Sequence, residues 1–388
     1  MERVISVSLG EIVLKGLNRK YFEDRLIKNM KRVLRDFGEY SIYKEQGKIY
    51  LEGLHDHQED AIKRLRKVFG LVYISPCIRT SREMEDIREA GLTLVKEKLH
   101  GDKMTTFKVE TSRSDKRYPL KSPEISRDVG GYVLKNTENL KVDVHNPDFM
   151  LYVDIKEYGY VYIDRTKAYG GLPIGTNGKG LLLLSGGIDS PVAGFMMAKR
   201  GVEVDAVHFH SYPFTSQRAE EKVLDLAKIV SMYTGPMMIY SINLLNIQKE
   251  ISKNCPEDEM TILSRRFMMR IAEEISKKRG YQVLITGENL GQVASQTIYS
   301  VDVINRSVQM PILRPLIGMD KVDIIEISKD IETYETSIKP FEDCCSVFLP
   351  KHPVTRPKIE DIEESERALD IETLIQEAIE GMKIVNIQ

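Results

Sequence analysis

The chain has 388 residues, of which 56 are Lys or Arg and 58 are Asp or Glu, so its formal net charge is −2. This length predicts two or three domains, and a charge so close to zero excludes a uniformly basic nucleic-acid-binding protein. Because the chain has only four cysteines and no apolar run long enough to cross a bilayer, we exclude a disulfide framework and a membrane-spanning segment, and we expect a cytoplasmic protein with no membrane partner.

Residues 1–75 alternate strand-like and helix-like patterns in the order βαββαβ. Strands are expected at 3–9, 40–44, 48–54 and 71–78, and helices at 19–35 and 58–67. This order is typical of a small ferredoxin-like sandwich, which we predict as the N-terminal domain.

A second mixed domain is predicted over residues 76–167. Its helices are expected at 83–98 and 122–135, and its strands at 105–111, 149–157 and 160–166. The middle of this domain is locally basic, with the residues Lys108, Arg113, Lys116, Arg117 and Lys121. Such a patch can bind RNA phosphates without reading the base sequence, and a solvated basic loop is the alternative.

The stretch "AYGGLPIGTNGKG", residues 168–180, contains five glycines and one proline and is the clearest linker in the chain. Beyond it, strands are expected at 181–185, 204–210, 237–242, 283–289 and 309–316, with amphipathic helices between them, including 219–232 and 261–278. This alternation predicts a third domain, 173–388, in which helices cover both faces of a parallel sheet. Ligands of such sheets bind at the carboxyl ends of the strands.

The sequence "LLLLSGGIDSPVAG" at 181–194 places a glycine pair between a buried strand and a helix start. We expect Asp189 and Ser190 to cap that helix, and the loop to offer amides, hydroxyls and one carboxylate to a phosphate chain and its Mg²⁺. No lysine follows the glycines, so the loop is not a Walker A motif. A simple tight turn is the alternative.

Protein side chains that bind a metal by themselves are not expected. The chain has no C-x-x-C pair, and His55 with His57, like His208 with His210, lacks a companion cysteine or carboxylate pattern. We therefore predict no metal ligands among the histidines and cysteines.

The motif S-G-G-x-D-S after a hydrophobic strand resembles the signature of the PP-loop ATP pyrophosphatases, which have an adenine-nucleotide α-hydrolase-like fold. Four further segments resemble the bacterial tRNA 4-thiouridine synthetases of the ThiI family, or tRNA sulfurtransferases: "GEIVLKGLNRKYFEDRL", "FKVETSRSDKRYPLKSPEI", "LITGENLGQVASQT" and "SIKPFEDCCSVFLPKHPVT". The resemblance covers almost the entire chain. It implies a multidomain α/β and α+β protein with a ferredoxin-like domain, a THUMP RNA-binding domain whose family profile can begin near residue 60, and a PP-loop domain.

The resemblance implies an ATP site at the strand ends of the third domain. The matching positions are Leu183, Leu184, Ser185, Gly186, Gly187, Asp189, Ser190, His208, Phe209, Arg265, Gly287 and Gln296. As alternatives, Leu183 could be a core residue and Arg265 a surface helix residue. In this family the loop holds the β- and γ-phosphates while ATP is cut between its α- and β-phosphates.

Three residues are predicted as catalytic by the same resemblance: Asp189, Lys321 and Cys344. Lys321 is expected near the phosphates or the adenylate, with an ordinary first-turn lysine as the alternative. Cys344 is expected to take part in sulfur transfer, with Cys345 as its rival and a buried inert cysteine as the alternative. Adjacent cysteines rarely satisfy the geometry of a disulfide with each other.

Long members of the family carry a C-terminal rhodanese-like domain whose cysteine holds the persulfide. Since the chain ends at Gln388, we expect a short form without that domain. The sulfur is then expected from a cysteine desulfurase, from another persulfide donor or from sulfide, and the sequence leaves this choice open.

The resemblance implies an ATP-dependent enzyme that adenylates O4 of the uridine at tRNA position eight and replaces that oxygen with persulfide-derived sulfur. The products are 4-thiouridine, AMP and pyrophosphate. A second role, in sulfurating a thiamine-pathway sulfur-carrier protein, stays open, and so does a homodimer.

Two alternatives are another PP-loop tRNA-modifying ligase and an RNA-binding protein whose nucleotide site has decayed. The extra C-x-x-C pairs or glutaminase domain expected of the first are missing. The intact loop residues argue against the second.

Overall fold

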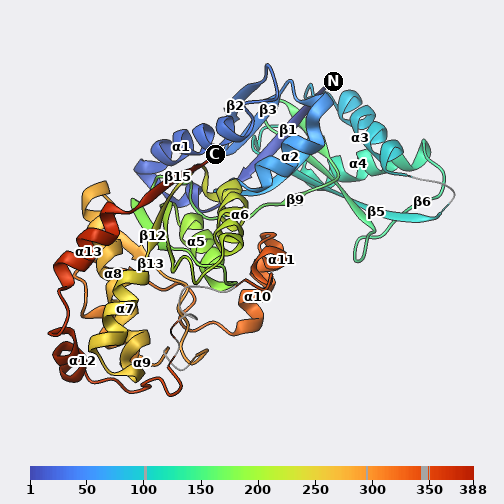
Figure 1. Ribbon diagram of the computed structural model, residues 1–388. Helices are drawn as coiled ribbons and strands as arrows, with labels where there is room; N and C mark the ends of the chain where they lie inside the picture. The colour runs from blue at the N-terminus through green and yellow to red at the C-terminus, as the bar shows by residue number, and fades with distance from the viewer. Residues whose placement is uncertain (100–102, 294–295, 342–347, 349) are drawn as a thin grey trace. The chain divides into compact units, whose positions relative to one another are not determined.

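The structure of the protein is a computed structural model (Figure 1). The described residues are 1–99, 103–293, 296–341, 348 and 350–388. They form two compact units, Met1–Pro173 and Ile174–Gln388. Within the described ranges, no helix combines the length and the apolar character that crossing a bilayer requires.

The first unit begins with the predicted βαββαβ order. Its elements are β1 (Glu2–Leu9), α1 (Arg19–Val33), β2 (Ser41–Glu45), β3 (Lys48–Glu52), α2 (Gln58–Arg66) and β4 (Leu71–Thr80), with the short 3-10 helices η1 (Glu11–Leu14), η2 (Gly16–Asn18) and η3 (His55–His57). β1 pairs antiparallel with both β3 and β4. The predicted ferredoxin-like fold is therefore confirmed.

The mixed segment that follows continues the same sheet. It contains α3 (Met84–Lys98), β5 (Thr105–Arg113), α4 (Ser122–Lys135), β6 (Leu140–Val142), β7 (Phe149–Ile155), β8 (Gly159–Tyr162) and β9 (Thr166–Lys167). β4 pairs with β8, so the strand order is β2-β3-β1-β4-β8-β7-β5-β6, and β9 pairs with β4. The expected boundary at 75/76 thus falls inside β4, a strand that both halves of the sheet share.

Alternation along the strands gives this sheet two different faces. On one face, Ile5 is buried with side chains of α1 and α2, and Phe107 is buried with side chains of α3 and α4. Neighbouring positions point to the opposite side, which we name the tyrosine face. Its buried cluster consists of Val4, Tyr50, Cys77, Tyr160 and Tyr162.

The second unit is built on a six-stranded sheet. Its strands are β10 (Lys179–Leu183), β11 (Glu203–His210), β12 (Met237–Asn243), β13 (Val283–Ile285), β14 (Ile312–Leu313) and β15 (Lys383–Ile387), in the order β14-β13-β10-β11-β12-β15. All neighbouring pairs are parallel except β12 and β15, which are antiparallel. The predicted parallel sheet is confirmed, and the antiparallel edge strand β15 is an addition to it.

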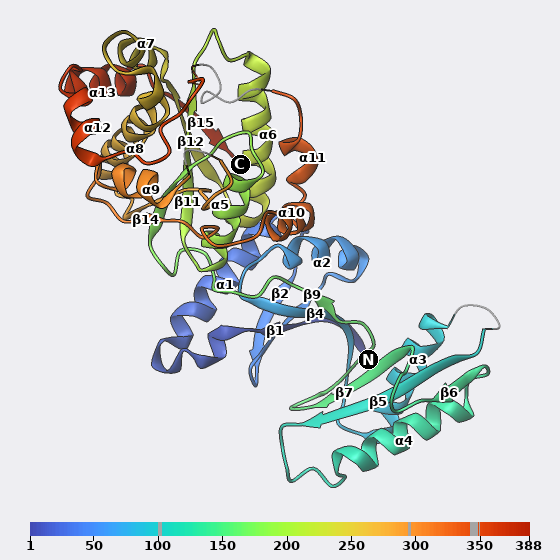
Figure 2. The same cartoon turned by 90° about the horizontal axis from the view of Figure 1, so that it is seen from below.

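Helices cover both faces of this sheet (Figure 2). On one side lie α5 (Asp189–Lys199) and α6 (Gln217–Thr234), in contact with α10 (Lys321–Asp330) and α11 (Tyr334–Ser337). On the other side lie α7 (Leu245–Asn254), η4 (Glu257–Glu259), α8 (Met260–Arg279), α9 (Ile298–Asn305), α12 (Ile359–Glu366) and α13 (Ile371–Glu380). The carboxyl ends of the central strands β10, β11 and β13 therefore lie between the two layers of helices.

A buried ion-pair cluster ties α12 to α8. Arg266 Nε lies 2.7 Å from Glu366 Oε1, and Arg270 NH1 lies 2.6 Å from the same oxygen. Burial alone would raise the pKa of Glu366, but the hydrogen bonds and charges of the two arginines hold this pKa below its usual value. The carboxylate is therefore ionised at neutral pH and fixes α12 to the helix that carries Arg265.

Candidate functional site

The glycine loop begins where β10 ends. After Leu183, the Leu184 amide still donates to Val207 O of β11 at 2.9 Å, and residues 185–188 then turn into α5. Ser185 is held in this turn because its amide donates to Ser190 Oγ at 2.9 Å, and the Gly187 amide donates to Ser185 Oγ at 3.3 Å. The predicted strand, loop and helix start are thus in place, with Gly186 and Gly187 inside the turn.

The predicted helix cap is wrong. The N-cap of α5 is Ile188, and among the described residues no side chain caps this helix. Asp189 and Ser190 lie in the first turn, and the Ser190 hydroxyl, which is buried, turns back to Ser185. The side chain that would cap the helix therefore closes the loop instead.

Gly287, after β13, packs directly against the start of α5. A Cβ on this residue would lie 2.7 Å from Ser190 N and 2.8 Å from Asp189 C, closer than real Cβ atoms approach backbone. Only glycine lets the two backbones meet here without a shift. Gly287 therefore sets the position of the loop's second half.

Lys321 lies against the glycine loop from a third segment. It is the first residue of α10, and its Nζ donates to Asp189 Oδ1 at 2.5 Å and to Gln292 Oε1 at 3.3 Å. Ser337 Oγ donates to Gly187 O at 3.4 Å. Two of the residues predicted as catalytic, Asp189 and Lys321, are thus in direct contact.

The end of β11 supplies the wall beside the loop. His208 is buried, with Nδ1 3.1 Å from Leu184 O, and Phe209 is buried in the main core of the unit. The pKa of His210 is lowered, mainly because the ring is buried and secondly because of the charge of the neighbouring His208. The Tyr212 amide donates to Nδ1 of His210 at 3.3 Å, which fits a neutral imidazole.

Arg265 is anchored by a carboxylate that the sequence analysis did not single out. Arg265 NH1 donates to Glu288 Oε1 at 3.2 Å, and Arg314 Nε donates to Glu288 Oε2 at 2.6 Å. Glu288 directly follows Gly287, so this ion pair brings Arg265 of α8 to the same loop as the glycine. The position of Glu288 next to Gly287 was the only feature of the sequence that could have pointed to it as a site residue. The two arginines that bind Glu288 are distant from it in sequence.

Gln296 is connected to the same loop through the backbone. Its carbonyl accepts from the Gly291 amide at 2.8 Å, while its side-chain oxygen is buried without a hydrogen-bond partner among the described residues. An acceptor left in this state is available to a ligand donor.

The predicted sulfur-handling residue, Cys344, and its rival Cys345 lie outside the described residues. Of the other two cysteines, Cys77 is buried, and burial raises the pKa of its thiol to about 12. Burial also raises the pKa of Cys255. Neither thiol has the thiolate character that sulfur transfer requires.

The five residues predicted to bind RNA lie on β5 and in the loop after it. They are Lys108, Arg113, Lys116, Arg117 and Lys121. Arg113 NH1 donates to Tyr118 O at 3.2 Å and to Leu120 O at 2.7 Å, so this side chain shapes the loop. Arg117 pairs with Asp115 at 3.1 Å but is 91% exposed. Lys116 and Lys121 are exposed as well, and Lys108 is half-buried.

The tyrosine face of the first unit carries cations over aromatic rings. The guanidinium of Arg165 lies 3.7 Å from the Tyr152 ring centroid, and Lys48 Nζ lies 5.1 Å from that of Tyr162. These four residues, together with Lys156, line a pocket of about 370 Å³. Tyr162 is buried, and Lys48 Nζ lies 2.6 Å from Asp154 Oδ2, so these cation–ring contacts stabilise the tyrosine face itself.

Three family profiles match the chain. Residues 175–371 match the family described as Thiamine biosynthesis protein (ThiI), residues 4–75 match the ThiI ferredoxin-like domain, and residues 81–164 match the THUMP domain. The chain belongs to the ThiI family. The predicted combination of ferredoxin-like, THUMP and PP-loop folds is confirmed.

ThiI-family relatives match the chain over its whole length. It is 54% identical over 387 residues to the "Probable tRNA sulfurtransferase" of Alkaliphilus metalliredigens, with 100% of this chain and 99% of the relative covered. Its identity to the protein of the same name from Finegoldia magna is 56% over 385 residues, with 99% and 98% covered. A crystal structure of a 4-thiouridine synthetase–RNA complex with bound ATP is 40% identical, with a TM-score of 0.92 and 100% of both chains covered.

Proposed function

We propose that this ThiI-family chain is an ATP-dependent tRNA uracil 4-sulfurtransferase. The observation that carries the proposal is the loop between β10 and α5, where amides, serine hydroxyls and Asp189 gather beside Lys321. The similar 4-thiouridine synthetase was solved with RNA and ATP, which supports the same two substrates here.

In the proposed reaction, O4 of the uridine at tRNA position eight attacks the α-phosphate of ATP. The bond to the β-phosphate breaks, and pyrophosphate leaves. The loop amides and Lys321 offset the negative charge on the phosphates, while Arg265, held by Glu288, lines the nucleotide side. Sulfur then attacks C4 of the activated uridine, and AMP leaves with the original oxygen.

The sulfur comes from a persulfide on a partner protein, such as a cysteine desulfurase. After the outer persulfide sulfur has attacked C4, an S–S bond still links the uridine sulfur to the donor cysteine. Cys344 is either that donor cysteine or the thiolate that attacks its sulfur; the attack frees 4-thiouridine and leaves a disulfide between the two cysteines, which an external thiol reduces. The raised pKa values of the Cys77 and Cys255 thiols support a role for the 344–345 pair. A thiamine-pathway sulfur-carrier protein is a further proposed acceptor of the same sulfur.

Mg²⁺ fits the loop as a companion of ATP. It is bound in many nucleotide enzymes by one or two carboxylates, phosphate oxygens and water, and Asp189 is the carboxylate that would hold it here. Among the described residues no cluster of three or more His, Cys, Asp or Glu forms a metal site, so the remaining ligands would be phosphate and water. The metal would neutralise charge on the phosphates.

For tRNA binding, we propose that the exposed basic loop of the first unit contacts phosphates, with Lys116, Arg117 and Lys121 outermost and Lys108 on the adjoining strand. Arg113 supports this loop from within. We further propose a homodimer acting in the cytoplasm.

The test is pyrophosphate release by the full-length protein with ATP and Mg²⁺, with and without a tRNA transcript. We expect release to depend on tRNA and to vanish when uridine eight is replaced by cytidine. With a cysteine desulfurase and cysteine present, the recovered tRNA should contain 4-thiouridine. Absence of pyrophosphate release would favour an RNA-binding protein with a decayed nucleotide site, whereas release with a different modified base would favour another PP-loop ligase.

A further inference from the structure

The loop after β11 presents two large aromatic rings to solvent. Tyr212 and Phe214 are 59% and 60% exposed, although aromatic side chains of this size are usually well buried. The loop directly follows the strand end that carries His208 and Phe209. The two rings therefore lie at the same edge of the sheet as the glycine loop.

Hydrogen bonds hold the backbone of this loop in one conformation beneath the rings. The fully buried Ser211 hydroxyl donates to Gln248 Oε1 at 2.5 Å, and the Ser211 amide donates to Thr215 Oγ1 at 3.1 Å. The Phe214 amide donates to Ser211 O at 2.8 Å. The polar side chains of the loop thus point inward and are satisfied, so the exposure of the two rings is not a product of a loosely held loop.

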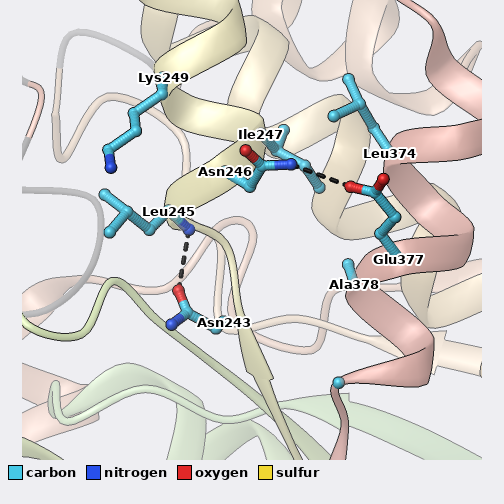
Figure 3. A pocket seen from close by; sticks show the side chains of 9 residues that line it. Asn243, Leu245, Asn246, Ile247, Lys249, Leu374, Glu377 and Ala378 are labelled. Carbon is cyan, nitrogen blue, oxygen red and sulfur yellow. Dashed lines mark hydrogen bonds between the residues drawn. The ribbon is translucent and has the colours of Figure 1, made fainter.

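A pocket of about 310 Å³ lies beside this loop, where β12 ends and α7 begins (Figure 3). Asn243 belongs to both features, because it lines the pocket and its Nδ2 donates to Tyr212 O at 3.2 Å. Asn246 Nδ2 donates to Glu377 Oε2 at 3.0 Å across the pocket, and Lys249 stands at its rim. Two side-chain amides, one lysine and the Glu377 carboxylate line the pocket together with apolar side chains. Amides can bond the edge of a base and apolar groups can pack on it, and the volume is near the lower end of the ~300–1,000 Å³ range of ligand sites.

The aromatic loop also contacts Phe348. The ring centroids of Phe214 and Phe348 are 5.9 Å apart, and Phe348 comes four residues after Cys344 in the sequence. The loop therefore contacts both Asn243 of the pocket and Phe348, at the same sheet edge as the glycine loop.

We propose that Tyr212 and Phe214 form the stacking platform for the target uridine, and that the Asn243 pocket receives a flanking nucleotide of the same strand. The inference rests on the proposed function and names where its RNA substrate enters the second unit. An enzyme that modifies O4 of a base must take that base out of its stack, and an extruded uracil then needs a π-face to lie on. Exposed aromatic rings supply this contact.

The platform is tested with Tyr212→Ala and Phe214→Ala, matched by the ring-keeping variants Tyr212→Phe and Phe214→Tyr. For the alanine variants we expect kcat/KM of tRNA-dependent pyrophosphate release to fall ~10- to 100-fold, the effect of losing one stacking contact. The Kd of tRNA should change less than about threefold, because phosphate contacts supply most of the affinity. The ring-keeping variants should retain activity. ATP affinity measured without tRNA and the unfolding midpoint should match those of the wild type.

Photocrosslinking gives a readout that does not depend on turnover. A tRNA transcript with 4-thiouridine at position eight is irradiated on the protein, and the crosslinked peptide is identified by mass spectrometry. We expect the crosslink within residues 211–216, and its loss in Tyr212→Ala with Phe214→Ala.

Two results would distinguish a failure of the proposed platform from a failure of the proposed function. If the wild type forms 4-thiouridine but the crosslink maps elsewhere and both alanine variants keep full kcat/KM, the platform is wrong and the proposed function stands. If the wild type forms no 4-thiouridine under any sulfur supply, the proposed function fails and the platform fails with it.

Discussion

Gly287 and Ser190 approach each other so closely that a Cβ on Gly287 would lie 2.7 Å from the Ser190 amide nitrogen. Gly287→Ala should therefore push the glycine loop away from the end of β13, at a cost of about 1–3 kcal/mol in unfolding free energy. Pyrophosphate release should fall at least ~10-fold, since catalysis depends on loop position to within about 1 Å. Gly318→Ala is the control, because no atom lies within 4 Å of the added Cβ. Wild-type release by Gly287→Ala would contradict this account.

Asp189→Ala and Lys321→Met should each fold normally but lose pyrophosphate release. The two side chains meet at 2.5 Å beside the loop and pack no core, so their loss should affect phosphate placement and leave stability nearly unchanged. We expect a loss of ~10²- to 10³-fold in kcat for each. The kcat of the double variant should be no lower than that of the less active single variant, because the two residues act as a unit. Additive losses would show that they act separately.

Cys344→Ser should separate activation from sulfur delivery. The variant should still release pyrophosphate with tRNA, but it should form no 4-thiouridine from a persulfide donor, because serine supplies neither a thiolate nor a persulfide-bearing sulfur. Free sulfide should restore part of the product. Cys345→Ser is the matched control and should keep most activity. Full thiolation by Cys344→Ser would remove this residue from the mechanism, and loss in Cys345→Ser alone would exchange the two roles.

Replacing Lys116 and Arg117 by alanine should weaken tRNA binding and reduce its dependence on salt. Each lost phosphate contact lowers the slope of log K against log salt by roughly one unit. Arg117 is 91% exposed although it pairs with Asp115, so it remains accessible to a phosphate. Lys228→Ala, an exposed lysine of the second unit, should leave the slope unchanged. The same slope in the double variant would move the RNA contact elsewhere.

Lys156 should make the stability of the first unit depend on alkaline pH. The pKa of Lys156 is lowered to about 8, mainly because the side chain is buried and secondly because of the positive charge of Lys48. Since the unfolded chain keeps a value near 10.4, it binds more protons than the folded protein between about pH 8 and about pH 10, so the unfolding free energy should rise with pH in that window. Denaturant unfolding of wild type and Lys156→Met would measure this rise. A rise of equal size in Lys156→Met would show that other groups cause it.

Strong local patterns explain what could be predicted. The βαββαβ order and the parallel strands could be predicted from apolar periodicity and turn residues. The glycine loop could be predicted from the motif SGGIDS, residues 185–190. Side-chain partners distant in sequence could not be predicted in this way. The Ser190 hydroxyl had two available partners, a helix end and Ser185, and only the folded loop decides between them. Glu288 becomes meaningful only when Arg265 and Arg314 meet it in space.

The sharing of β4 by both halves of the first sheet, and the edge strand β15 of the second, could not be predicted for a similar reason. The amino-acid sequence of β4 does not indicate that this strand pairs with β1 on one side and with β8 on the other. β15 was not predicted as a strand, and its place in the sheet is defined by pairing with β12, which lies far earlier in the chain.

Strand β15 also has a consequence for the order in which the second unit can fold. It pairs with β12 across a long stretch of intervening chain, so a protein emerging from the ribosome carries an uncovered β12 edge until residues 383–387 have been made. An uncovered edge of this kind recruits strands from other chains. Translation that terminates shortly before residue 383 would therefore release molecules whose sheet has an open β12 edge, which favours aggregation.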